Sequence, residues 1–130
     1  MKPLSAVETV KAIQSGKSTA EKLVRERLDY IATREPVVKA WVHLDPEKAL
    51  VQARAADKAS GGLLRGVPIG VKDIIDTYDM PTGHNSPIFA GTQPFGDAAC
   101  VALSRAANAV IMGKTVTTEF ANRHPGPTTN

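Results

Sequence analysis

The stretch Gly66-Val67-Pro68-Ile69-Gly70-Val71-Lys72-Asp73 decides the fold class of this 130-residue chain. Its alternate apolar residues favour a β-strand, and glycine, proline and aspartate bound the run. Lys72 is therefore expected where a buried strand ends, the place at which open α/β sheets bind ligands. Burial there can remove the charge of a lysine and make it a base near neutral pH. The simpler alternative is a lysine that only extends its ammonium into water.

The rest of the rear half also predicts an α/β arrangement. A strand over Val67–Val71 precedes an irregular stretch, a helix from Asp97 to about Ala107 and a second apolar strand over Ala109–Met112. Strand, connection with helix, and strand form a βαβ unit, whose crossover should be right-handed. Both strands are continuously apolar, which is typical of a sheet covered on both faces.

The front half predicts mainly helices. Two capping boxes, Ser5 with Glu8 and Ser18 with Glu21, each open a helix. Later boundaries are a stop at Gly16, an end of the second helix at Pro36, a strand over 37–44, and a third helix from Asp45-Pro46 to Gly61-Gly62. We expect a helical front segment, 1–62, followed by the start of an α/β core, 63–130.

Several motifs, in order along the chain, resemble the amidase signature family. The stretch at 66–73 matches the family's G-V-P-(I/V)-x-V-K-D, and further matches follow over nearly the whole chain. They are Asp76-Thr77, Pro81-Thr82-Gly83, Phe95-Gly96-Asp97-Ala98, the A-G-A-V-I-x-G-K-T-like run Ala107–Thr115 with Asn108 at the usual glycine, Glu119-Phe120-Ala121, and the G-P-T-x-N-like Gly126–Asn130. The resemblance implies the N-terminal part of the amidase signature fold, a helical front followed by a βαβ portion of a mixed sheet.

The same resemblance implies amide hydrolysis by a Ser-Ser-Lys relay in which Lys72 is the base. The family's two serines lie in a glycine- and serine-rich segment, which we expect beyond Asn130. None of the serines of this chain lies in such a run: Ser5, Ser15, Ser18, Ser60, Ser86 and Ser104. We therefore expect an N-terminal amidase fragment that is inactive alone. By analogy with the family, Ala121 and Asn122 are weak candidates for substrate binding.

Two other classes of protein remain open, a noncatalytic binding module and an amidotransferase-type subunit on the same fold. The tRNA-dependent amidotransferase subunit usually has N-M-D-E-F after G-K-T, whereas this chain has Val116-Thr117-Thr118-Glu119-Phe120, which favours a free-standing amidase. A net charge of +3 raises nucleic acid as a partner, but aromatic residues are only 5% and no basic run interleaves with them. We expect a small-molecule amide substrate, no nucleic acid, and association with other copies of the chain or with a C-terminal part of the same enzyme.

No cofactor or metal is expected. His43, His84 and His124 lack metal-ligand spacing, although His84 lies in a polar turn that could touch substrate. Gly113-Lys114-Thr115 lacks the glycine that a phosphate loop needs at position 108, so we predict a tight turn there, with Lys114 either supporting the site or facing solvent. Cys100, the single cysteine, is expected to be packed and inert. Without a signal peptide core or an apolar span, a cytoplasmic setting without membrane contact is expected.

Overall fold

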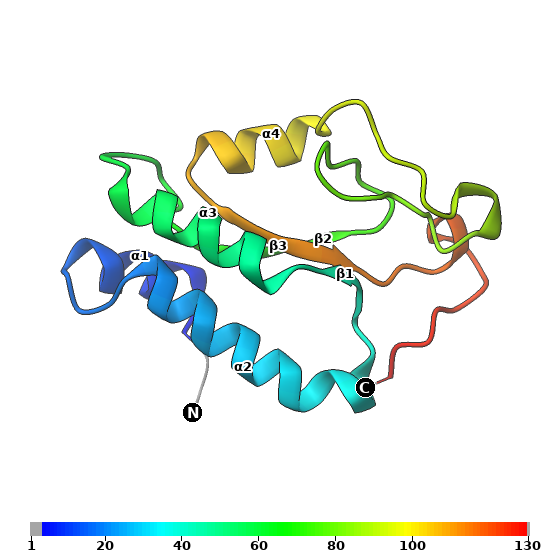
Figure 1. Ribbon diagram of the computed structural model, residues 1–130, viewed down its shortest axis with the longest axis horizontal. Helices are drawn as coiled ribbons and strands as arrows, with labels where there is room; N and C mark the ends of the chain where they lie inside the picture. The colour runs from blue at the N-terminus through cyan, green and yellow to red at the C-terminus, as the bar shows by residue number, and fades with distance from the viewer. Residues whose placement is uncertain (1–3, 130) are drawn as a thin grey trace.

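The computed structural model describes residues 4–129, which form a three-stranded mixed sheet with helices on both faces (Figure 1). The strand order is β1-β3-β2, with β2 parallel and β1 antiparallel to the central β3. In chain order the elements are α1 (Ala6–Gln14), α2 (Ala20–Val38), β1 (Trp41–Leu44), α3 (Pro46–Lys58), β2 (Pro68–Lys72), the 3₁₀ helix η1 (Pro87–Phe89), α4 (Ala99–Ala106), β3 (Val110–Thr115) and the 3₁₀ helix η2 (Glu119–Ala121). The expected α/β class and mixed sheet are confirmed.

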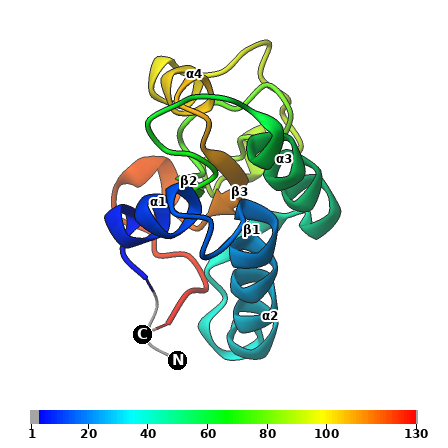
Figure 2. The same ribbon diagram turned by 90° about the vertical axis from the view of Figure 1, so that its left-hand side faces the viewer.

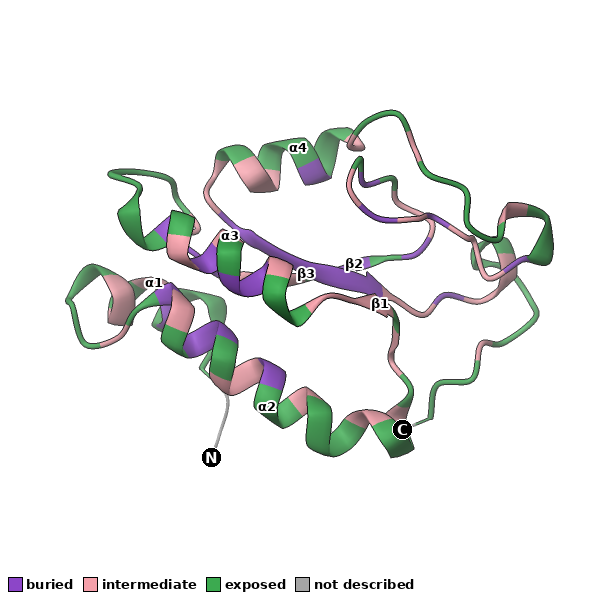
Figure 3. Ribbon diagram, viewed as in Figure 1, coloured by how far each residue is buried: buried purple, intermediate pink, exposed green. Residues whose placement is uncertain are grey.

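The central strand β3 is covered on both faces because its apolar residues point alternately to two clusters. Val110 and Met112 pack with the buried residues of α2 and α3, whereas Ile111 packs with Val71 of β2 and Val101 of α4. Figure 2 shows α4 and α2 on opposite sides of the sheet, and Figure 3 shows β3 as the most continuously buried strand. This matches the expectation for a continuous apolar run. β2 is less buried, since Val71 is its one fully buried residue.

The tight turn expected at Gly113-Lys114-Thr115 is absent, because these residues continue β3. They pair with Gly70, Val71 and Lys72 of β2. Gly113 makes the continuation possible on the other side, where β1 passes so closely that a β-carbon at this position would overlap the carbonyl oxygen of His43. The lysine of this tripeptide therefore lies inside the sheet and is completely buried.

The start of α2 differs by one residue from the predicted capping box. Thr19, not Ser18, is the N-cap, and its hydroxyl accepts from the Lys22 N–H at 3.1 Å. The carboxylate of Asp57, on α3, accepts the N–H groups of Ala20 and Glu21 at 2.6 and 3.0 Å. A distant carboxylate thus replaces the expected reciprocal glutamate. The capping box of Ser5 with Glu8 and the N-cap at Asp45 are both confirmed.

The end of α2 also corrects a prediction. Pro36 lies inside the last turn, and the helix continues to Val38 before Lys39 takes a left-handed conformation with φ 53°. Proline removes only one hydrogen bond near a helix end, where the backbone ladder is finishing anyway. Val37 and Val38 are therefore helical, and the strand predicted over 37–44 is limited to β1, Trp41–Leu44.

The helix expected from Asp97 begins two residues later, because the Asp97 side chain is used elsewhere. It accepts from the Tyr78 N–H and from Arg105 Nε, each at 2.9 Å, and so fixes the loop after β2 against α4. Cys100, expected to be packed, is exposed on α4. No helix within residues 4–129 is long and apolar enough to cross a membrane.

Candidate active site

Lys72 is the last residue of β2 and lies where the two parallel strands end together. It pairs with Thr115 at the end of β3 and is exposed. Strand alternation places it on the same face as Gly70, over which the Trp41 ring and the Thr115 methyl group lie. Within residues 4–129 its side chain takes part in no ion pair and no hydrogen bond. The burial expected to make Lys72 a base is not found among residues 4–129, and its ammonium is available to a reacting group brought to this face.

Asp73, the next residue, is held on all sides. Its backbone N–H donates to the Thr115 carbonyl at 2.9 Å, and its carbonyl accepts from the His84 N–H at 3.0 Å. Both carboxylate oxygens accept from the Gly83 N–H, at 3.3 and 3.2 Å. Such contacts with backbone amides are typical of an aspartate that fixes a turn, here the turn beside Lys72.

The partner of Asp73 is Lys114, whose side chain is completely buried. Its Nζ donates to Thr82 Oγ1 at 2.6 Å and to the Pro81 carbonyl at 3.1 Å, and it lies 3.3 Å from Asp73 Oδ1. Three acceptors match the three N–H bonds of an ammonium. Burial lowers the pKa of Lys114, and the negative charge of Asp73 opposes that shift most strongly. The side chain thus supports the site from within and does not face solvent.

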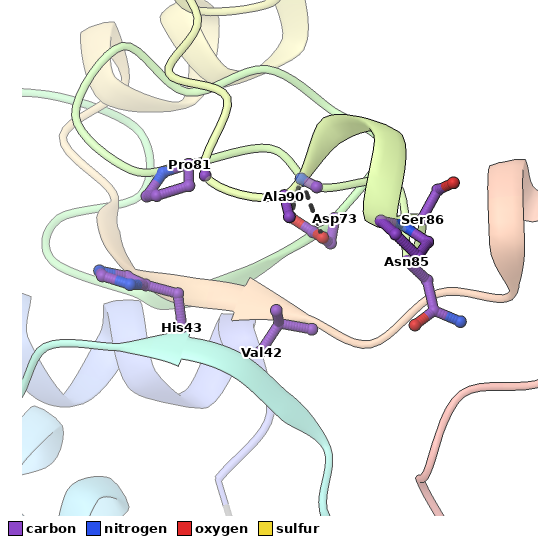
Figure 4. A pocket seen from close by; sticks show the side chains of 10 residues that line it. Val42, His43, Asp73, Pro81, Asn85, Ser86 and Ala90 are labelled. Carbon is purple, nitrogen blue, oxygen red and sulfur yellow. Dashed lines mark hydrogen bonds between the residues drawn. The ribbon is translucent and has the colours of Figure 1, made fainter.

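A cavity of about 430 Å³ opens on the face that carries Asp73 (Figure 4). Its walls come from β1, through Val42 and His43, and from the loop that follows β2, including Pro81, Asn85 and Ser86. Ser86 is buried and donates from Oγ to Glu119 Oε1 at 3.0 Å. Lys72 does not line this cavity, because strand alternation places it on the opposite face of β2.

Beside this cavity an aromatic cluster joins the loop after β2 to the segment after β3. The His84 ring lies 5.0 Å from the Phe89 ring and 5.9 Å from the Phe120 ring, and the Phe120 N–H donates to the His84 carbonyl at 3.0 Å. His84 is thus packed between aromatic rings. Its contact with substrate stays a prediction. The backbones of His84 and Phe120 have φ of 55° and 46°, values that non-glycine residues adopt rarely.

The two weak candidates for substrate binding follow this cluster. Ala121 ends η2 with φ 57°, and the Asn122 N–H donates to the Glu119 carbonyl at 2.8 Å. Both residues are exposed, and neither lines the cavity of Figure 4. Their role in substrate binding stays a prediction. Among residues 4–129 no group of three or more side chains could hold a metal ion.

The buried ion pair of Lys114 with Asp73 was not predicted from the sequence. A lysine two residues after the apolar run 109–112 was the available indication, because a charge that continues a buried strand needs a partner. Because a tight turn was predicted at Gly113-Lys114-Thr115, no buried partner for Lys114 was sought. Thr82 was noted only as part of a family motif, although its hydroxyl is the closest acceptor of Lys114.

Comparison with known proteins identifies similar sequences. A family model described as Amidase matches residues 22–128. A glutamyl-tRNA(Gln) amidotransferase subunit of Salinispora arenicola is 42% identical over 123 residues, which are 91% of this chain and 25% of that protein. A Mycobacterium tuberculosis protein named as an amidase, AmiD, is 40% identical over 129 residues, 94% of this chain and 27% of its own length.

Solved structures of related enzymes superpose well. The peptide amidase of Stenotrophomonas maltophilia matches with a TM-score of 0.83 and 29% identity, over 91% of this chain and 26% of the amidase. An inhibitor-bound complex described in connection with an s-triazine catabolic enzyme matches with a TM-score of 0.88 and 29% identity, over 98% of this chain and 30% of that one. The chain thus spans about a quarter to a third of the length of the relatives it matches.

Proposed function

The chain belongs to the Amidase family, and we propose that it carries the general base, Lys72, of an enzyme that opens amide C–N bonds. An amide is a poor electrophile with a poor leaving group, so its cleavage needs an activated nucleophile and a proton for the departing nitrogen. A neutral Lys72 would take the proton of a serine relay supplied by the remainder of the enzyme and return it to the leaving amine. The proposed substrate is a small-molecule amide.

One observation supports the proposal most directly. β2 ends, together with its parallel pairing to β3, at a lysine whose side chain has no ion-pair or hydrogen-bond partner within residues 4–129. Lys72 is exposed and has no ion-pair or hydrogen-bond partner within residues 4–129, whereas Lys114 beside it has three acceptors. A base must be free to exchange its proton, and an ammonium with three acceptors is not. Lys72 is therefore the better candidate of the two.

A second candidate function is that of an amidotransferase-type subunit. It is favoured by the 42% identity to the Salinispora arenicola protein. The segment Val116–Phe120, which departs from the usual N-M-D-E-F, favours the free-standing amidase instead. Both functions use the same opening of an amide bond. They are distinguished by assaying the complete gene product for ammonia release from glutamine and from simple aliphatic and aryl amides.

The proposal is tested by changing Lys72 in the complete gene product. We expect Lys72→Ala to lower amide turnover by at least about 10²–10⁴-fold with cooperative unfolding retained. Lys72→Arg should not restore activity, because a guanidinium stays charged. Lys58→Ala, an exposed change at the end of α3, is the matched control and should retain activity. Near-normal turnover in either Lys72 variant would refute the role of Lys72.

Residues 1–130 alone should show no amidase activity above background, even on activated anilides, because the proposed relay needs serines outside this segment. Turnover that survives repurification and disappears with Lys72→Ala would contradict this expectation. We propose that the enzyme is located in the cytoplasm.

A further inference from the structure

The buried cluster around Lys114 contacts the residue that follows the proposed base. Lys114 Nζ, from β3, is bonded to Thr82 Oγ1 and to the Pro81 carbonyl, and it lies 3.3 Å from Asp73 Oδ1. The side chains of Lys114 and Asp73 are 0% and 2% exposed. The cluster thus ties the end of β2, the centre of the sheet and the loop at 81–83 together without access to water.

The residues on both sides of Lys72 are held by hydrogen bonds. Val71 is held in the sheet on one side of it, and on the other side the N–H, the carbonyl and both carboxylate oxygens of Asp73 are bonded. Lys114 Nζ lies 3.3 Å from this carboxylate, which also accepts from the Gly83 N–H. A buried charge pair is often neutral for stability but selects one arrangement of the groups around it.

The charges that face the cluster favour a cationic Lys114. Asp76 and Asp79, on the loop after β2, add to the effect of Asp73 on its ammonium. Asp79 is itself paired with Lys48 of α3 at 3.2 Å and with Arg105 of α4 at 2.7 Å. Asp73 has Lys114 as its one ion-pair partner among residues 4–129. Without Lys114, an uncompensated carboxylate would directly follow Lys72.

We propose that Lys114 is a positioning residue for Lys72, acting through Asp73: it fixes the backbone from which the base projects and cancels the charge of the neighbouring carboxylate. This inference rests on the proposed function, because it assigns a supporting residue to the same base. It predicts an effect on turnover more than on substrate affinity, since a small displacement of a reacting group lowers rates strongly.

The test uses the complete gene product and a substrate that it hydrolyses. Lys114→Met keeps most of the side-chain volume and removes the charge. We expect kcat to fall about 10–100-fold with KM changed less than about threefold.

The double variant Asp73→Asn/Lys114→Met separates positioning from general destabilisation. Removing both charges should recover kcat at least about fivefold over Lys114→Met. A purely structural role predicts instead that kcat recovers only in proportion to the free energy of unfolding, and that KM changes along with kcat. Lys58→Met, an exposed change at the end of α3, is the control and should keep kcat within about twofold.

A second variant tests the inference if Lys114→Met does not fold. Where Lys114→Met shows no cooperative unfolding, kcat is measured for Thr82→Val, which removes one acceptor of Lys114 and leaves every charge in place. It should lower kcat about three- to tenfold at unchanged KM. The inference is overturned if a folded Lys114→Met or Thr82→Val variant has wild-type kcat while Lys72→Ala is inactive. If Lys72→Ala is active, the proposed function fails as well.

Discussion

Asp73 and Lys114 form an ion pair that joins the end of β2 to the middle of the sheet, with 3.3 Å between Asp73 Oδ1 and Lys114 Nζ. Neither side chain reaches solvent to more than 2%. The pair is surrounded by three further hydrogen-bonding groups, from Pro81, Thr82 and Gly83. A polar cluster of this kind is stable only while each member keeps its partners.

Asp73→Ala should therefore destabilise the fold strongly, because it leaves the Lys114 ammonium buried without a counter-charge. We expect the free energy of unfolding in urea to fall by about 3–5 kcal/mol. The double variant Asp73→Asn/Lys114→Met should lose less than the sum of its single variants. Asp76→Ala, an exposed change three residues away, is the control and should alter stability by less than about 0.5 kcal/mol. Equal losses in the two alanine variants would contradict the prediction.

Gly113→Ala should destabilise the sheet where β1 crosses closest to β3. The new β-carbon would overlap the His43 carbonyl, so the two strands must move apart. We expect a loss of about 1–3 kcal/mol, measured by chemical denaturation. Gly61→Ala is the matched control, because no atom lies within 4 Å of its β-carbon position. A Gly113→Ala variant as stable as the control would show that β1 can shift without loss.

The free energy of unfolding should depend on pH through the carboxyl group of Glu21. Hydrogen bonds from Arg25 and then Arg54 lower the pKa of its carboxyl group below its ordinary value of 4.5. The stabilising contribution is complete above pH 4.5 and is lost as the pH falls through the lowered value. Glu21→Gln should therefore be less stable than wild type at pH 7, with the difference shrinking at pH 3.

The control for this prediction is a background in which both arginines are replaced, Arg25→Gln/Arg54→Gln. In that background Glu21→Gln should shift the urea midpoint equally at the two pH values, because the ion pairs are gone. High salt should shrink the effect of Glu21→Gln at pH 7 in the wild-type background, since these side chains are partly exposed. A difference that grows on acidification would refute the prediction.

The isolated 130-residue chain should associate with itself. β2 forms no strand pair on its outer side among residues 4–129, and several large apolar side chains are exposed, among them Leu63 at 86%, Ile88 at 81% and Leu103 at 70%. Open edges and apolar patches are typical association surfaces. Sedimentation should show concentration-dependent species, and a dye for exposed apolar surface should bind.

Leu103→Ser, on the exposed side of α4, should reduce this dye binding, whereas Ser104→Ala on the same helix should not. A monomer that melts sharply at high concentration without a dye signal would show that the front helices close the sheet by themselves.

Local patterns in the sequence determined much of the fold. The capping box at Ser5, the N-cap at Asp45 and the apolar run of β3 follow from contacts within a few residues, so they are readable from the chain. The amidase motifs likewise identified the family and pointed to Lys72 at a strand end, where the structure places it.

Tertiary contacts decided the remainder. Asp57 caps α2 from 36 and 37 residues away, the approach of β1 to Gly113 extends β3, and Lys114 meets Thr82 across 32 residues. No local pattern encodes such contacts, because each depends on where distant segments pack. For the same reason the sequence marked Lys72 as the candidate base, but only the folded sheet revealed the buried ion pair that holds the residue beside it.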